Sequence, residues 1–227
     1  MDSIRKVQLG EREILLLGTA HVSQTSVTDV ESAVEELSPD HICIEIDESR
    51  YKTLREGQSW EKLNIYQVLK QRKGFLLLAN LVLSSFQRRM GIDLGVAPGA
   101  EMMRAVEVAD ERSIPYSFCD REIQTTLRRA WRRTGFWGKN KMLAALLSSI
   151  FSKEKLTNEE IERLKSRNAL EDMMAELADY LPSVKEVLID ERDRFLATRI
   201  YQAQGSTILA VVGAGHVEGI ASHLERL

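Results

Sequence analysis

Two apolar runs in this 227-residue sequence end in the same pattern, a glycine followed three residues later by a histidine. Residues 14–17 (ILLL) lead to Gly18 and His21, and residues 207–212 (TILAVV) lead to Gly213 and His216. Continuous apolar runs are typical of strands buried on both faces, which occur in parallel sheets covered by helices. Glycine at the strand end permits a tight turn and a close approach of the backbone to a ligand. We therefore expect an α/β fold with both histidines at the carboxyl edge of one parallel sheet, where ligands collect in such folds.

The remaining sequence patterns predict how this sheet is built. Residues 7–17 are typical of a hairpin turning at Gly10, Glu11 and Arg12. Helical spacing over 23–37, followed by the strand-like run 41–47 (HICIEID), predicts a right-handed βαβ unit. A further strand is expected at 114–119 (IPYSFC) and a last helix from about Val217.

Long helical stretches separate these strands, at about 48–112 and 122–204. The predicted fold is a small, mostly parallel central sheet with an N-terminal hairpin, flanked and capped by these two helical insertions in a single domain of residues 1–227. The most apolar stretches, 75–86 and 142–151, are shorter than the ~20 residues that a helix needs to cross a bilayer. We expect both to be helices that pack on a core or a partner.

Composition limits the classes of function and location. The net charge of −3 gives no basic surplus for phosphate, so nucleic-acid binding is not expected. The N-terminus has no apolar signal-peptide core, which argues against export by that route. Cys43 and Cys119 fall in apolar runs and are expected to be inert core thiols. His41 and His223 lack the glycine-led setting and are expected to be solvated surface groups.

Acidic and basic groups follow the other predicted strands. Glu45 and Asp47 belong to the run 41–47, and Asp120-Arg121 follows the strand predicted at 114–119. Strand alternation places Glu45 and Asp47 on the face opposite the isoleucines of that run. A carboxylate in a central strand is costly to bury unless a cation or metal pairs with it. Together with the two histidines, these groups predict a functional site at the sheet edge.

Several short motifs resemble those of the TraB/PrgY family, which is related to the Tiki metalloproteases and the ChaN/erythromycin-esterase-like proteins. Each motif is weak alone, but their order and spacing are specific and span nearly the whole chain. The matching segments are GTAHVS at 18–23, IEID at 44–47, PGAEM at 98–102, DREIQTTLRRAW at 120–131, ERDRFLA at 191–197 and GAGHVEGI at 213–220.

The resemblance implies that His21 and His216 are the paired histidines of the site and that Glu45 is its acidic residue. In Tiki-like relatives this set is associated with manganese- or cobalt-dependent peptide cleavage. Some relatives carry Arg-Asn where this chain has Arg192-Asp193, which puts a substrate-binding role there in question. Family members typically continue into C-terminal membrane-spanning helices, so this chain resembles the soluble domain of a membrane-associated protein, with the cytoplasmic face favoured. Further residues on family motifs are Glu101, Asp120, Arg121 and Arg192.

The leading hypothesis is a metal-dependent hydrolase, most simply a metallopeptidase acting on peptides or pheromones. His21, Glu45 and His216 would bind a divalent ion with an open position for water, and this ligand set suits Mn, Co or Zn. One of Asp47, Glu101 or Asp120 would be the general base, and Arg121 or Arg192 would stabilise an oxyanion or a peptide carboxylate.

Two alternatives and a question of assembly stay open. The domain could be a non-catalytic module that sequesters a peptide or pheromone between the helices at 75–86 and 142–151. Separately, the basic and aromatic stretch 128–141 could lie on anionic lipid, or it could be a solvated helix face whose tryptophans pack inward. Self-association into a homo-oligomer is also left open.

Overall fold

The structure is a computed structural model that describes residues 4–19, 24–56, 99–138, 140 and 185–227. Two compact units make up the chain. The first comprises residues 1–59, 94–122 and 189–227, and the second comprises residues 60–93 and 123–188. The apolar stretches 75–86 and 142–151, expected to be helices, lie outside the described residues, so the insertions and the single domain stay predictions.

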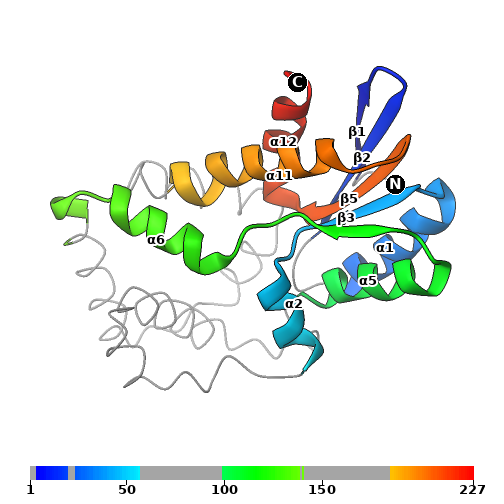
Figure 1. The fold of residues 1–227 in the computed structure, drawn as a ribbon, viewed down its shortest axis with the longest axis horizontal. Coiled ribbons are helices and arrows are strands. Elements are labelled where there is room, and N and C mark those ends of the chain that lie inside the picture. Colours follow the sequence, from blue (N-terminus) through cyan, green and yellow to red (C-terminus); the bar gives the residue numbers. More distant parts are fainter. Residues whose placement is uncertain (1–3, 20–23, 57–98, 139, 141–184) are drawn as a thin grey trace, which may run out of the picture. The chain divides into compact units, whose positions relative to one another are not determined.

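A five-stranded sheet forms the centre of the first unit (Figure 1). Its strand order is β1-β2-β5-β3-β4, in which β1 is antiparallel to β2 and every other neighbouring pair is parallel. The predicted mixed α/β fold, with a mostly parallel sheet and an N-terminal hairpin, is therefore confirmed. The strands are β1 Ile4–Leu9, β2 Arg12–Thr19, β3 His41–Ile44, β4 Tyr116–Phe118 and β5 Thr207–Gly213.

The hairpin between β1 and β2 closes through a two-residue turn. Leu9 pairs with Arg12, which leaves Gly10 and Glu11 between the strands. Gly10 has a φ of 61°, in the left-handed region that two-residue hairpin turns require and glycine adopts without a steric penalty. The turn thus lets an edge strand fold back directly onto the buried strand β2.

Helices cover both faces of the sheet (Figure 1). In β2, Leu15 and Leu17 pack against one helical layer, and Ile14 and Leu16 against the other. This two-residue alternation explains why the run is apolar without interruption, since a strand between two layers exposes neither face to water. One layer holds α1 Gln24–Leu37 and α5 Ala100–Arg112, and the other holds α11 Glu191–Gln202 and α12 Val217–Leu224.

Two strands are shorter than their sequence patterns suggest. The run 41–47 is a strand only to Ile44, because the Ile46 amide turns back to donate to the Ile44 carbonyl at 2.8 Å. Asp47 then caps α2 Glu48–Arg55. The strand expected at 114–119 is restricted to Tyr116–Phe118, and its start follows Pro115, which has no amide hydrogen for a sheet ladder.

The described part of the second unit contains α6, Ile123–Arg133. A π-helical turn, Glu186–Asp190, precedes α11, and a 3₁₀ turn, Ala214–His216, precedes α12. Among the described residues, no helix combines the length and apolarity that crossing a bilayer requires.

The two cysteines and His41 belong to β3 and to the end of β4. Cys43 and Cys119 are free and buried, and a hydrogen bond with Cys119 together with burial raises the pKa of the Cys43 thiol. His41 was expected to be a solvated surface group, but it is half-buried and lies 3.0 Å from the hydroxyl of Ser117. Burial lowers the pKa of the His41 imidazole. The expectation was wrong because β4 pairs beside β3 and brings Ser117 against the imidazole.

Candidate functional site

The carboxyl ends of the parallel strands lie at one edge of the sheet. Thr19 at the end of β2 pairs with Gly213 at the end of β5, and Ile44 at the end of β3 pairs with both Val211 and Phe118. Side chains that follow these strands therefore start from neighbouring positions, although they are far apart in the sequence.

Glu45 is the first residue beyond β3 and is buried, with 5% of its surface exposed. Its main-chain amide still donates to the carbonyl of Val211 at 3.0 Å, which fixes the backbone against β5. Its Oε2 accepts a hydrogen bond from the amide of Gly213 at 2.6 Å. The carboxylate is thus tied to the first glycine of the late Gly-x-x-His motif.

Arg192 of α11 supplies the cation that this buried carboxylate needs. Its Nη2 donates to Glu45 Oε1 at 2.5 Å and to Asp120 Oδ2 at 2.7 Å, and its Nε donates to Asp120 Oδ1 at 3.3 Å. Burial alone would lower the pKa of Arg192, but Glu45 and Asp120 outweigh burial and hold that pKa above its ordinary value. Asp120 thus binds the Nε and Nη2 side of the guanidinium through both of its oxygens, and Glu45 shares Nη2 with it.

His216 is contacted through both ring nitrogens. Nδ1 lies 2.5 Å from Asp193 Oδ1, and Nε2 lies 3.0 Å from Arg192 Nη1. A guanidinium can only donate, so Nε2 accepts from Arg192, and the ring proton of the neutral imidazole is assigned to Nδ1, which donates to Asp193. The same Nε2 lies 3.6 Å from Glu45 Oε1. His216 Nε2 and Glu45 Oε1 therefore lie side by side and both accept from the guanidinium of Arg192.

Asp193 reaches His216 because a neighbouring residue has no side chain. Asp193 is buried, with 4% of its surface exposed, and its carboxylate lies against Gly219 in the first turn of α12. A Cβ at Gly219 would overlap both the Oδ2 and the Cγ of Asp193. Close packing between α11 and α12 thus explains why the last glycine of the GAGHVEGI segment, Gly219, has no side chain.

Asp120 and Arg121 join the cluster from the loop after β4. Asp120 Oδ1 also accepts from the amide of Arg121 at 2.8 Å, which holds the carboxylate in place. The Arg121 guanidinium forms an ion pair with Glu191 at 3.3 Å, and both side chains are mostly buried. Arg121 is therefore bound to α11 through Glu191, the residue before Arg192.

The sequence was compared with known proteins. A model of the TraB/PrgY/gumN family matches residues 3–227. The chain belongs to this family. It is 35% identical over 222 residues to an uncharacterized protein of Methanocaldococcus jannaschii, covering 96% of this chain and 55% of that protein. It is 29% identical over 237 residues to a TraB domain-containing protein of Homo sapiens, covering 91% of this chain and 61% of that protein. This TraB-family chain thus spans little more than half the length of these relatives.

The structure brings Glu45, Asp120, Arg192 and His216 together, three of them after strands and Arg192 from α11. His21 lies outside the described residues, two positions after Thr19 at the carboxyl end of β2. Among the described residues, no group of three or more histidines, cysteines and carboxylates could by itself hold a metal ion. A metal site with His21 as a third ligand therefore stays a prediction.

Two other predicted residues have different surroundings. Asp47 Oδ1 accepts the amides of Ser49 and Arg50 at 2.9 and 3.1 Å, so it serves as the N-cap of α2. Its predicted role as a general base stays a prediction. Glu101 is buried in the first turn of α5, in the helical layer on the face of the sheet opposite α11.

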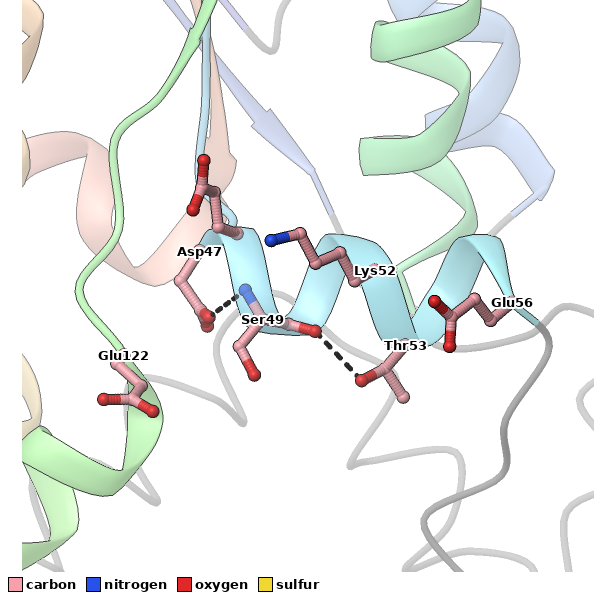
Figure 2. A pocket seen from close by; sticks show the side chains of 7 residues that line it. Asp47, Ser49, Lys52, Thr53, Glu56 and Glu122 are labelled. Carbon is pink, nitrogen blue, oxygen red and sulfur yellow. Dashed lines mark hydrogen bonds between the residues drawn. The ribbon is translucent and has the colours of Figure 1, made fainter.

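A polar hollow of about 580 Å³ opens beside α2 (Figure 2). Figure 2 shows the α2 side chains along one side and Glu122 on the other. Asp47 follows Glu45 by two residues, and Glu122 follows Arg121 directly. The hollow is acidic, with four carboxylates against one ammonium. Its lining residues are Asp47, Glu48, Ser49, Lys52, Thr53, Glu56 and Glu122.

Sequence reasoning missed the role of Asp193, which it treated only as a departure from Arg-Asn in some relatives. Its neighbour Arg192 and the acid Glu191 both carry charge on the same helix, so charge alone does not single Asp193 out. One signal was available. Asp193 falls among the apolar positions Leu196, Ala197 and Ile200 on the buried face of α11, where a carboxylate requires a partner.

Proposed function

We propose that this TraB-family chain is a divalent-metal-dependent hydrolase that cleaves peptides at the cluster around Glu45 and His216. The observation that carries the proposal is the convergence of a buried carboxylate oxygen and an unprotonated histidine nitrogen, 3.6 Å apart, at the carboxyl edge of the sheet. Both groups are held by further hydrogen bonds, Glu45 by Gly213 and His216 by Asp193. Such preorganisation is typical of catalytic and metal sites rather than of surface loops.

Distance and charge both fit a divalent cation. Two ligands bound at about 2.1 Å in tetrahedral geometry lie about 3.4 Å apart, close to the separation of Glu45 Oε1 and His216 Nε2. Glu45, Asp120 and Asp193 set three carboxylates against the single guanidinium of Arg192, an excess of two negative charges among these four side chains. We assign Glu45, His216 and the nearby sequence position His21 as the ligands of Mn, Co or Zn.

A bound divalent metal would lower the pKa of a water molecule and polarise a carbonyl. The remaining residues have separate tasks. Asp193 keeps the proton of His216 on Nδ1, so that Nε2 carries no proton and would bind the metal in place of its hydrogen bond from Arg192. Arg192, held by Asp120, can donate to a carbonyl oxygen as it develops negative charge or to a peptide carboxylate. Asp47, Glu101 and Asp120 stay candidates for the general base.

Metal binding is the first test. Isothermal titration of MnCl₂, CoCl₂ or ZnCl₂ into the chain should give one strong site, and His21→Ala and His216→Ala should each abolish it. His223→Ala is the matched control, because His223 is a histidine of α12 outside the cluster. Unchanged metal affinity in both site variants would remove the metal from the proposal.

Peptide cleavage is the second test and separates catalysis from sequestration. A peptide library incubated with the metal-loaded chain and followed by mass spectrometry should yield new termini, which Glu45→Gln abolishes. Saturable peptide binding with no product, with or without metal, would instead identify a sequestering module. Such a result would contradict the hydrolase while leaving the metal titration interpretable.

A further inference from the structure

The segment containing α6 is strongly basic within a chain of net negative charge. Residues 123–141 contain six lysines and arginines and no aspartate or glutamate, whereas the whole chain has a net charge of −3. A basic excess confined to one helix and the turn after it produces a local positive potential rather than a general affinity for anions.

The arginines of α6 face away from its packed side. Thr126 and Ala130, one helical turn apart, are buried, and Trp131 is partly buried. The four arginines of the helix are exposed, and Arg133 forms an ion pair with Glu186. The helix is thus amphipathic, with cations along its solvent face. These exposed residues are Arg128, Arg129, Arg132 and Arg133.

Two large aromatic side chains follow the basic face. Phe136 is 73% exposed and Trp137 is 82% exposed. Their rings contact each other edge to face, with centroids 6.0 Å apart, so the pair forms one small apolar tip. The interpretation that both tryptophans of this stretch pack inward is therefore wrong for Trp137, which follows the end of the helix at Arg133.

We propose that Phe136 and Trp137, together with the exposed arginines of α6, form a docking surface for a lipid bilayer containing anionic lipids. Arginines near a membrane are attracted by its negative surface potential, and their aliphatic stems can lie against apolar groups. Tryptophan and phenylalanine beside them can enter the boundary between headgroups and acyl chains. The combination of cations and an aromatic tip fits this interface better than a nucleic acid, which would face a chain of overall negative charge.

Vesicle flotation tests the proposal with the 227-residue chain. The chain should float with vesicles of phosphatidylcholine mixed with phosphatidylserine and much less with phosphatidylcholine alone. Replacing Arg128 and Arg132 together by glutamine should weaken binding by about tenfold or more, since each basic residue near the surface contributes substantially to attraction. Phe136→Ala combined with Trp137→Ala should also abolish flotation, and added salt should weaken binding of the wild type.

Two control variants separate the effect of the docking surface from general effects of lost charge or lost aromatic rings. Arg194→Gln with Arg199→Gln removes the same charge from exposed positions of α11, and Phe195→Ala removes a partly exposed aromatic ring. Both should float as the wild type does, and circular dichroism establishes that every variant is folded. Equal flotation of the docking-surface variants and the control variants would overturn the proposal, as would absence of flotation for the wild type. A change in oligomeric state caused only by the docking-surface variants, with flotation unchanged, would also overturn it. Such a result would identify a second copy of the chain as the partner at this surface.

Discussion

At the level of single residues, the imidazole of His216 is held from both sides, by Asp193 at Nδ1 and by Arg192 at Nε2. A carboxylate on one ring nitrogen fixes the tautomer and increases the basicity of the other nitrogen, as it does for histidines that bind metals. The pairing requires Gly219, since any side chain there would displace the carboxylate of Asp193.

Loss of the Asp193 carboxylate should therefore weaken the proposed metal site without removing a ligand. We expect Asp193→Ala to lower metal affinity by about 10- to 100-fold, and Asp193→Asn to lower it less, because an amide oxygen can still accept the Nδ1 proton. Isothermal titration measures the affinity, and ¹⁵N chemical shifts of His216 report the tautomer. Identical affinity and tautomer in the wild type and Asp193→Ala would contradict this role.

Arg192 is the residue whose loss should most affect stability. Arg192→Met would leave the buried carboxylates of Glu45 and Asp120 without their shared cation, and breaking such a pair costs about 3–5 kcal/mol of unfolding free energy. Urea denaturation measures this loss, and Arg194→Gln, at an exposed position of the same helix, is the control. A divalent cation that binds the folded variant should restore part of the stability. A loss as small as that of the control would contradict the assigned ion pairs.

The sequence predicted those site residues that follow a strand or a glycine, because an apolar strand pattern indicates where the strand ends and which residues come next. Glu45, Asp120 and His216 are of this kind. Asp193 and Arg192 come from a helix, and their meeting with His216 depends on how α11 packs beside α12. No local pattern specifies that packing, so only the family motif indicated Arg192.

At the level of elements, the two Gly-x-x-His segments require close packing of one on the other. A Cβ at Gly18 of β2 would lie 2.9 Å from Val217 Cγ2 and 3.2 Å from the Cα of Ala214. The glycine is therefore needed for the approach of the turn after β5, independently of any ligand.

Gly18→Ala should destabilise the fold by about 1–3 kcal/mol, the usual cost of adding atoms to a packed interior. Thermal or urea unfolding measures the change. Gly135→Ala is the control, since a Cβ at Gly135 would meet nothing within 4 Å. Equal stability of the two variants would mean that the turn after β5 shifts freely, contrary to its close packing against Gly18.

Element boundaries were less predictable than element identity. The run 41–47 has strand periodicity to its end, yet β3 stops at Ile44 because the backbone turns there to start α2 under the cap of Asp47. Apolar alternation continues through such a turn, since Ile46 still packs in the same core as Ile42 and Ile44. Periodicity reports which face is buried and not which amides are paired.

At the level of the whole molecule, strand order is the feature that the sequence left open. β5 is last in the chain but central in the sheet, between β2 and β3. The position of β5 between β2 and β3 places His216 beside Glu45. This order depends on contacts between residues more than 160 positions apart, such as Glu45 and Gly213. Membrane association through a C-terminal region, and the side of the membrane, stay predictions.

Global stability should fall on mild acidification through His41. Burial lowers the pKa of His41 from its ordinary value of 6.5, so the unfolded chain binds a proton more readily than the folded protein. The contribution of neutral His41 is fully present above pH 6.5 and is lost as the pH falls through the lower folded-state pKa. Urea unfolding across this range should show a decline that His41→Gln reduces. An equal decline in that variant would assign the effect to other groups.

Anomalous diffraction from crystals grown with MnCl₂ tests the central claim most directly. One strong peak is expected within bonding distance of Glu45 and His216, with the ring of His21 as a third ligand and Asp193 still bound to Nδ1 of His216. Absence of a peak at this position, or a His21 ring directed away from Glu45 and His216, would contradict the proposed metal centre.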